Sequence, residues 1–187
     1  MPGSGVDLAP SDIIGFWFGE PMCRHWFRAT NDLDRKIRER FEGLWRQAAD
    51  RGLAEWQQTA EGCLALAIVL DQFPLNMYRG EARSYATEAR SIEIALKAVD
   101  RGFDCQLPVE QRAFLYMPLM HSENLAHQDA SVRLFEQAGL VSNARFARHH
   151  RELIRRFGRF PHRNETLGRD STPEELAYLD SKVAFKG

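Results

Sequence analysis

An apolar run, CLALAIVL at residues 63–70, limits the fold more than any other part of this sequence. As a helix this run would have no polar face, and a helix without a polar face has to be buried on all sides. We therefore predict a central helix over residues 59–70, with Thr59 as its N-cap residue. The run is far shorter than the roughly 20 apolar residues that span a bilayer, so we expect no membrane association.

Helical periodicity extends over nearly the whole chain, and no segment shows the alternation of a β-strand. Pro74 and Pro118 are expected to end helices because proline lacks a backbone N–H. Ser11 and Ser122 can each cap the helix that follows them. The expected helices cover residues 11–18, 32–49, 59–70, 83–101, 109–116, 123–138, 142–157 and 172–183. The sequence therefore predicts an all-α fold.

One short pattern recurs along the chain and indicates how the helices are arranged. The segment AADRGL (residues 48–53) is echoed by AVDRGF (98–103) and more loosely by EQAGL (136–140). Each is typical of a helix end at which glycine takes the left-handed conformation and the next apolar residue folds back. Repeated ends of one kind predict stacked antiparallel helical hairpins, in a right-handed tetratricopeptide-like array.

The length of 187 residues is typical of one domain with a substantial core. The N-terminal segment MPGSGVDLAP has no basic stretch followed by an apolar one, so it does not resemble a signal peptide. Its glycines and prolines favour a flexible lead-in over residues 1–10. We expect residues 11–187 to form a single all-helical domain.

Charge and cysteine content bear on location and partners. The formal net charge is −1, so no overall field attracts nucleic acid, and no nucleic-acid partner is expected. The three cysteines, Cys23, Cys63 and Cys105, are far apart and match no zinc or disulfide spacing. Reduced thiols in a cytoplasmic protein are the simplest interpretation. The 4 Trp and 12 Phe leave room for a homodimer interface.

The segment LDQFPLNMYRG (residues 70–80) places a carboxylate at the end of the central helix. The negative end of a helix disfavours Asp71, and a buried carboxylate needs a cation or several donors. Arg79 is the nearest cation in sequence, Gln72 continues the helix, and Asn76 can cap the carbonyls that the helix end leaves free. A structural ion pair is the simplest interpretation of this segment.

The segment YMPLMHSENLAHQ (residues 116–128) places polar side chains on an inward helix stripe. His121 and Gln128 share this stripe with apolar residues. Glu123 would lie in the first turn of the next helix, where a carboxylate is favoured, and can reach His127. An inward histidine is usually a hydrogen-bonded core residue, so a structural role is the leading interpretation.

Arginines are concentrated near the C-terminus. Between residues 145 and 169 the chain has eight Arg and two Glu. Such a surplus can bind phosphate or carboxylate, or it can neutralise acidic helix faces. Arg159, His162 and Arg163 fall outside regular helix, beside aromatic residues, and are the better candidates for a specific role. We expect Arg159 or Arg163 to pair with Asp71, so that this segment folds back on the central helix.

Several motifs together resemble a known family. They are IIGFWFG, the pair WF at residues 26–27, LALAIVLDQFPLN, MPLMHSENLAHQ and RFGRFPHRNETLGRDSTPEE. In order, over residues 13–179, they resemble the bacterial family called domain of unknown function 924. The resemblance implies an all-helical fold related to tetratricopeptide repeats, and it implies no activity. The family pattern usually reads DQFPRN, whereas this chain has Leu75 at the arginine position, which argues against a site that depends on a cation there.

Three hypotheses follow for function. The first is a purely structural polar network. The second is a binding module for a peptide, a protein partner or a small anionic ligand. The third is a hydrolase in which His121 is the acid or base, Asp71 or Glu123 orients it, and Arg163 holds an oxyanion.

No nucleophile elbow or phosphate-binding loop supports the hydrolase hypothesis, and no cofactor is expected. A metal site built from His121, Glu123 and His162 is a minor alternative, and the main expectation is that no metal is bound. The ligand-binding candidates are Gln72, Asn76, Arg79, Arg159, His162, Arg163 and Asn164.

Overall fold

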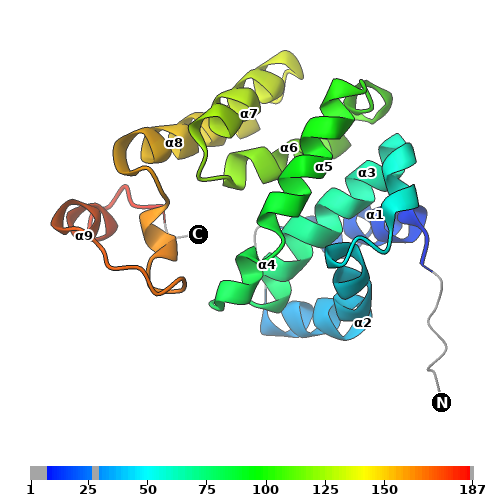
Figure 1. The fold of residues 1–187 in the computed structure, drawn as a ribbon, viewed down its shortest axis with the longest axis horizontal. Coiled ribbons are helices and arrows are strands. Elements are labelled where there is room, and N and C mark those ends of the chain that lie inside the picture. Colours follow the sequence, from blue (N-terminus) through cyan, green and yellow to red (C-terminus); the bar gives the residue numbers. More distant parts are fainter. Residues whose placement is uncertain (1–7, 27–29, 186–187) are drawn as a thin grey trace.

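The computed structural model describes residues 8–26 and 30–185, and this part of the chain contains helices and no β-strand (Figure 1). The all-α prediction is therefore confirmed, whereas most of the expected N-terminal lead-in lies outside the described residues. The helices are α1 (Pro10–Phe18), α2 (Asn31–Ala49), α3 (Ala60–Ala67), α4 (Phe73–Met77), α5 (Glu88–Asp100), α6 (Val109–His121), α7 (Leu125–Gln137), α8 (Val141–Phe157) and α9 (Pro173–Leu179). Among the helices of these two ranges, none is long and apolar enough to cross a membrane.

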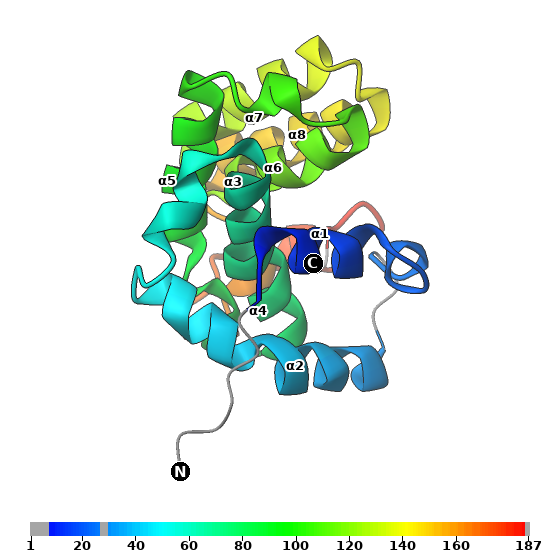
Figure 2. The same cartoon turned by 90° about the vertical axis from the view of Figure 1, so that its right-hand side faces the viewer.

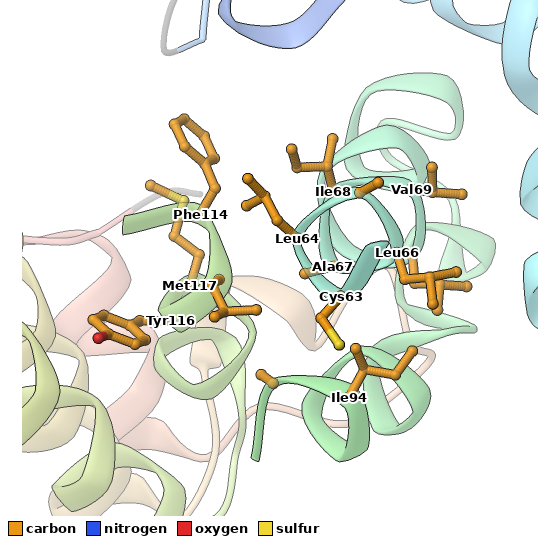
Figure 3. Close-up of a cluster of buried hydrophobic side chains, with 14 of the residues drawn as sticks. Cys63, Leu64, Leu66, Ala67, Ile68, Val69, Ile94, Phe114, Tyr116 and Met117 are labelled. Atoms are coloured by element: carbon orange, nitrogen blue, oxygen red, sulfur yellow. The ribbon is translucent and has the colours of Figure 1, made fainter. Parts of the chain in front are cut away.

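The apolar run of residues 63–70 lies at the centre of the fold, as predicted. Every side chain in the run is at most 2% exposed. Helices α1, α5 and α6 pack on α3, and α2 packs on α4. Figure 3 shows α3 side chains facing Phe114 and Met117 of α6 on one side and Ile94 of α5 on another. Burial on all sides explains why this helix carries no polar stripe.

Pro74 does not end the central helix, contrary to the prediction. The backbone passes from α3 through a π-helical turn (Ile68–Gln72) directly into α4. Proline cannot donate the hydrogen bond that the carbonyl of Leu70 would otherwise accept. The hydroxyl of Thr87 donates to this carbonyl instead, at 2.6 Å, and so replaces the missing bond. Thr87 lies 17 residues away, which is why the segment itself did not reveal the compensation.

Pro118 does not end a helix either, because α6 continues through it to His121. An interior proline costs about 3 kcal/mol in an isolated helix. Here every residue from 113 to 120 is buried, so packing on both sides of α6 outweighs that cost. The expected caps Ser11 and Ser122 are also wrong, since Ala9 and Asn124 occupy the N-cap positions. Thr59 does cap α3, through its side chain.

The recurring helix ends are confirmed in two of three places. Gly102 and Gly139 take the left-handed conformation, and the next residues, Phe103 and Leu140, bond back to the preceding helix turn. In the first copy, Arg51 and not Gly52 has the positive φ, 65°. The left-handed residue that ends the helix is therefore one position earlier in this copy, and a glycine at the expected position does not by itself show where a helix ends.

The second half of the chain packs in sequence order: α7 lies on α6, and α8 lies on α7 (Figures 1 and 2). After α8 comes a closing segment, residues 158–172, which leads to α9. This end of the molecule has a small apolar cluster of its own, formed by Leu153, Ile154, Phe160 and Tyr178. The closing segment is thereby held against the ends of α6 and α8, next to the polar residues described below.

Candidate functional site

The buried carboxylate of Asp71 is paired with a histidine. Nδ1 of His121 lies 2.9 Å and 3.0 Å from the two carboxylate oxygens. The amide of Gln72 donates to the same carboxylate at 2.6 Å. The Asp71 side chain is 4% exposed and that of His121 is 19% exposed. The prediction that Arg79, Arg159 or Arg163 would pair with Asp71 is therefore wrong, whereas the Asp71–His121 contact that the hydrolase hypothesis needs is present.

Local backbone geometry explains this pairing. Asp71 belongs to the π-helical turn, where the wider backbone changes the direction of side chains relative to a regular helix. His121 is the last residue of α6, and so it lies at the end of a rigid element. Because a carboxylate can only accept, Nδ1 is the donor in this contact, and the other ring nitrogen, Nε2, is not bound by Asp71. Within the described part of the chain, Nε2 of His121 forms no hydrogen bond.

Arg163 connects the closing segment to this pair. One guanidinium nitrogen donates to Glu88 at 2.7 Å and another donates to the backbone carbonyl of His121 at 2.6 Å. The guanidinium also stacks on Tyr85 and Phe160, 4.5 Å and 4.7 Å from the ring centroids. The side chain is 6% exposed, and its Nε is buried without a partner among the described residues. The closing segment does fold back as expected, but on Glu88 and His121.

These groups surround a small cavity, which we call the junction cavity. Its volume is about 10 Å³, close to that of one water molecule. The lining residues are Leu70, Asp71, Leu75, Ser84, Tyr85, Glu88, His121 and Arg163. Leu75 lies in this wall and adds an uncharged, apolar side chain to it. The polar members of the wall come from four separate stretches of sequence.

The pKa values of two carboxyl groups near the cavity are shifted in opposite directions. Burial raises the pKa of Glu88, although the positive charge of Arg163 opposes this effect. Burial also acts to raise the pKa of Glu123, but Arg169 and the backbone N–H of Phe160 outweigh it, and the pKa of Glu123 is lowered. Burial, reinforced by Arg163, lowers the pKa of His162 to about 4. His162 is therefore neutral at physiological pH.

Glu123 holds the closing segment, and among the described residues its side chain bonds to Arg169 and Phe160 and not to His121. Arg169 donates to it at 2.7 Å and the backbone N–H of Phe160 at 2.8 Å. His127, its expected partner, bonds to Ser122 instead. In the part of the chain that the structure describes, no three potential ligands lie close enough to hold a metal ion, so the minor alternative of a metal site at His121, Glu123 and His162 is contradicted.

The other residues predicted for the site do not line the junction cavity and form contacts elsewhere. Arg79 pairs with Asp34 at 2.9 Å, and Asn76 donates to the carbonyl of Gln72 at 2.8 Å. Arg159 forms a two-pronged pair with Glu175 near the start of α9. Glu175 also accepts from the Asn164 amide, at 3.2 Å. The ring of His162 packs against Phe160 and Phe185, so these three closing-segment candidates fasten α9 and the C-terminal residues.

Sequence reasoning missed Glu88, Tyr85 and Ser84 as parts of the site. The expected helix 83–101 placed all three inside one regular element, whereas the structure has a 3-10 turn at Ala82–Tyr85 and begins α5 at Glu88. The available signal was Thr87, a good N-cap residue just before the first glutamate. If the helix is predicted to start after Thr87, Glu88 is its first residue and lies at the end of a helix, where it can meet the ends of other helices.

Comparison with known proteins gives a family and a fold. The family model described as bacterial protein of unknown function (DUF924) matches residues 13–182. A solved structure, the protein of unknown function ATU0120 from Agrobacterium tumefaciens, is 39% identical, with a TM-score of 0.86 over 91% of this chain and 96% of that chain. A search of curated proteins finds no match.

Proposed function

The chain belongs to the bacterial family of unknown function DUF924, and we propose that it is a hydrolase whose general base is His121, oriented by Asp71. The observation that carries this proposal is the double contact of the Asp71 carboxylate with Nδ1 of His121. A buried carboxylate that holds one ring nitrogen directs the other toward a reactant and stabilises the imidazolium that forms.

The surroundings of His121 supply the other parts that such a reaction needs. The junction cavity has room for about one water molecule beside the dyad. In the proposed reaction Nε2 takes a proton from this water as the water oxygen attacks the carbonyl carbon of an ester. The bond between this carbon and the leaving oxygen then breaks, and the leaving oxygen receives the proton from Nε2. Arg163 lies in the same wall and supplies positive charge near the developing oxyanion.

The apolar residues of the cavity wall limit which substrates can bind. Leu75 lines the cavity next to the polar groups and is partly exposed, so a substrate at the mouth of the cavity would present an ester group to His121 and an apolar neighbour to Leu75. The substrate would have to lie outside the cavity, because the cavity itself has room for only about one water molecule. A small ester, open to solvent on one side, fits this arrangement better than a long polymer.

The test uses p-nitrophenyl acetate and p-nitrophenyl phosphate as probes. Wild-type protein is expected to release nitrophenol from one of them above the buffer rate, and His121→Ala to lose about a hundredfold or more of that excess. Asp71→Asn should lose activity while keeping a folded circular dichroism spectrum. Arg79→Gln is the matched control, since Arg79 pairs with Asp34 outside the cavity.

Kinetic and NMR results could each contradict this function. One is an excess rate that His121→Ala leaves unchanged, or no excess rate on either probe. The other is a ¹⁵N spectrum in which His121 is neutral with its proton on Nε2, because Asp71 would then not hold Nδ1–H. The spectrum reports on the dyad whether or not the right ester has been tried.

A second candidate is a binding module, favoured by two exposed apolar residues on α8. Val141 is 78% exposed and Phe146 is 47% exposed. We propose that α6, α7 and α8 form a tetratricopeptide-like stack in one cytoplasmic domain, and that the N-terminal end of α8, which carries both residues, binds a protein partner, most simply a second copy. Light scattering should then show a dimer that Phe146→Glu dissociates, and a monomeric wild-type chain would contradict the dimer.

A further inference from the structure

The wall of the junction cavity carries more negative charge than positive charge. Among the described residues that line it, Asp71 and Glu88 are carboxylates and Arg163 is a guanidinium. A general base has to be neutral before it takes a proton, and with His121 neutral these three groups leave one net negative charge. Charges in a protein wall are screened less than charges in water. The wall therefore attracts a positive group of a molecule at the mouth and repels a negative one.

Glu88 is the charged group that such a molecule meets first. The Glu88 side chain is 23% exposed, whereas the side chains of Asp71 and Arg163 are 4% and 6% exposed. Glu88 is also the first residue of α5, so its place at the mouth is fixed by the start of a helix. The ion pair with Arg163, at 2.7 Å, stabilises its charged form. A carboxylate is thus held at the mouth, beside the histidine of the dyad.

One oxygen of the Glu88 carboxylate has no partner. Oε2 accepts from Arg163, and Oε1 forms no hydrogen bond with any residue that the structure describes. Arg163 also has an unpaired atom, Nε, but this atom is buried. An ammonium group at the mouth can donate to Oε1, and hydrogen bonds between charged partners are stronger than those between neutral groups. The mouth thus offers an acceptor for a cation and no exposed donor of similar charge for an anion.

We propose that Glu88 is a specificity-determining residue that selects small esters with a positively charged group near the ester carbonyl. This inference rests on the proposed function, because His121 is what places the ester at the mouth. The ammonium group of such a substrate lies beside Oε1 of Glu88 while the carbonyl carbon faces the water in the cavity. An ester with a carboxylate at the same position is disfavoured, because it meets the surplus negative charge of the wall.

Matched ethyl esters test the preference through turnover. Ethyl glycinate, ethyl propanoate and monoethyl malonate carry an ammonium, a methyl and a carboxylate group, respectively, on the same carbon atom. At about pH 6.5 an α-amino group is still protonated. The value of kcat/KM, divided by the rate in buffer, should be about threefold to fivefold higher for ethyl glycinate than for ethyl propanoate, and lowest for monoethyl malonate. In Glu88→Gln the ratio of the first two should fall to about one, whereas general damage to the site lowers all three values alike.

Matched amides test the same preference without turnover. Glycinamide, propanamide and malonamate are titrated into the protein, and the ring signal of His121 is followed by NMR and assigned through His121→Ala. Glycinamide should saturate the shift at the lowest concentration, and Glu88→Gln should remove its advantage over propanamide. Glu55→Gln is the matched control, because Glu55 is an exposed carboxylate that does not line the cavity, and it should keep the preference.

The two arms separate this inference from the function on which it rests. Ester hydrolysis that depends on His121 but shows no preference for ethyl glycinate would overturn the role of Glu88 and leave the hydrolase function standing. No excess hydrolysis of any ester would overturn the hydrolase function. The amides then decide on Glu88 alone: equal affinity for all of them, an unshifted His121 signal, or a preference that Glu88→Gln retains would overturn its role in selecting a cation.

Discussion

Replacing Thr87 by valine should destabilise the fold strongly, although the two side chains have nearly the same shape. The Thr87 hydroxyl donates to the carbonyl of Leu70 at 2.6 Å and accepts from the indole N–H of Trp45 at 3.1 Å. Both bonds are buried. The first one compensates for Pro74, which has no N–H to offer that carbonyl. Valine would leave a buried acceptor and a buried donor without partners.

The magnitude follows from these two groups. A buried polar group that loses its partner costs about 1–3 kcal/mol, so two of them give about 2–4 kcal/mol once some relaxation is allowed. For a chain of this length, 1 kcal/mol shifts Tm by about 2–4 °C, and the expected fall in Tm is therefore about 5–15 °C. The π-helical turn that carries Asp71 would lose its support, so the dyad should be disturbed as well.

Urea unfolding followed by circular dichroism measures the effect. Thr87→Ser is the matched control, because it keeps the hydroxyl and removes only a methyl group. The serine variant should retain most of the stability and an unchanged m-value. The reasoning would be refuted if valine and serine differed by less than about 0.5 kcal/mol, since the buried carbonyl of Leu70 would then have found another donor.

Three further predictions concern other parts of the molecule. Burial lowers the pKa of His150 to about 3, below the value of about 6.5 in an unfolded chain. The neutral side chain therefore stabilises the fold: its whole contribution is present above about pH 6.5, and it is lost as the pH falls. At pH 5 the loss is about 2 kcal/mol, and His150→Phe should flatten this part of the urea-midpoint curve against pH. Gly62→Ala should destabilise by more than about 1 kcal/mol in thermal melts, because a Cβ there would meet the Trp56 carbonyl oxygen; Gly43→Ala, at a site with open space, is the control. A double-mutant cycle of Glu123→Gln and Arg169→Gln should give a coupling of about 1 kcal/mol or more, and a coupling near zero would mean that this pair does not hold the closing segment.

The predictions about Pro74, Pro118 and Asp71 are wrong for the same kind of reason. Local rules place prolines at helix ends and so predict that Pro74 and Pro118 end helices, whereas contacts with distant residues keep both helices continuous. The expected ion pair of Asp71 failed for a similar reason. Arg79, Arg159 and Arg163 are equivalent by charge, and no local rule decides which of them reaches a given carboxylate.

Sequence alone determined the helical class, the burial of residues 63–70 and the capping role of Thr59. Each of these depends on periodicity or on residues within one turn, where backbone geometry is the same in any fold. The tertiary structure decided that Asp71 meets His121, 50 residues later, and that Arg163 reaches Glu88, 75 residues earlier. These pairings depend on how whole helices are placed relative to one another, and that placement is set by packing of the entire core, which no short stretch of sequence encodes.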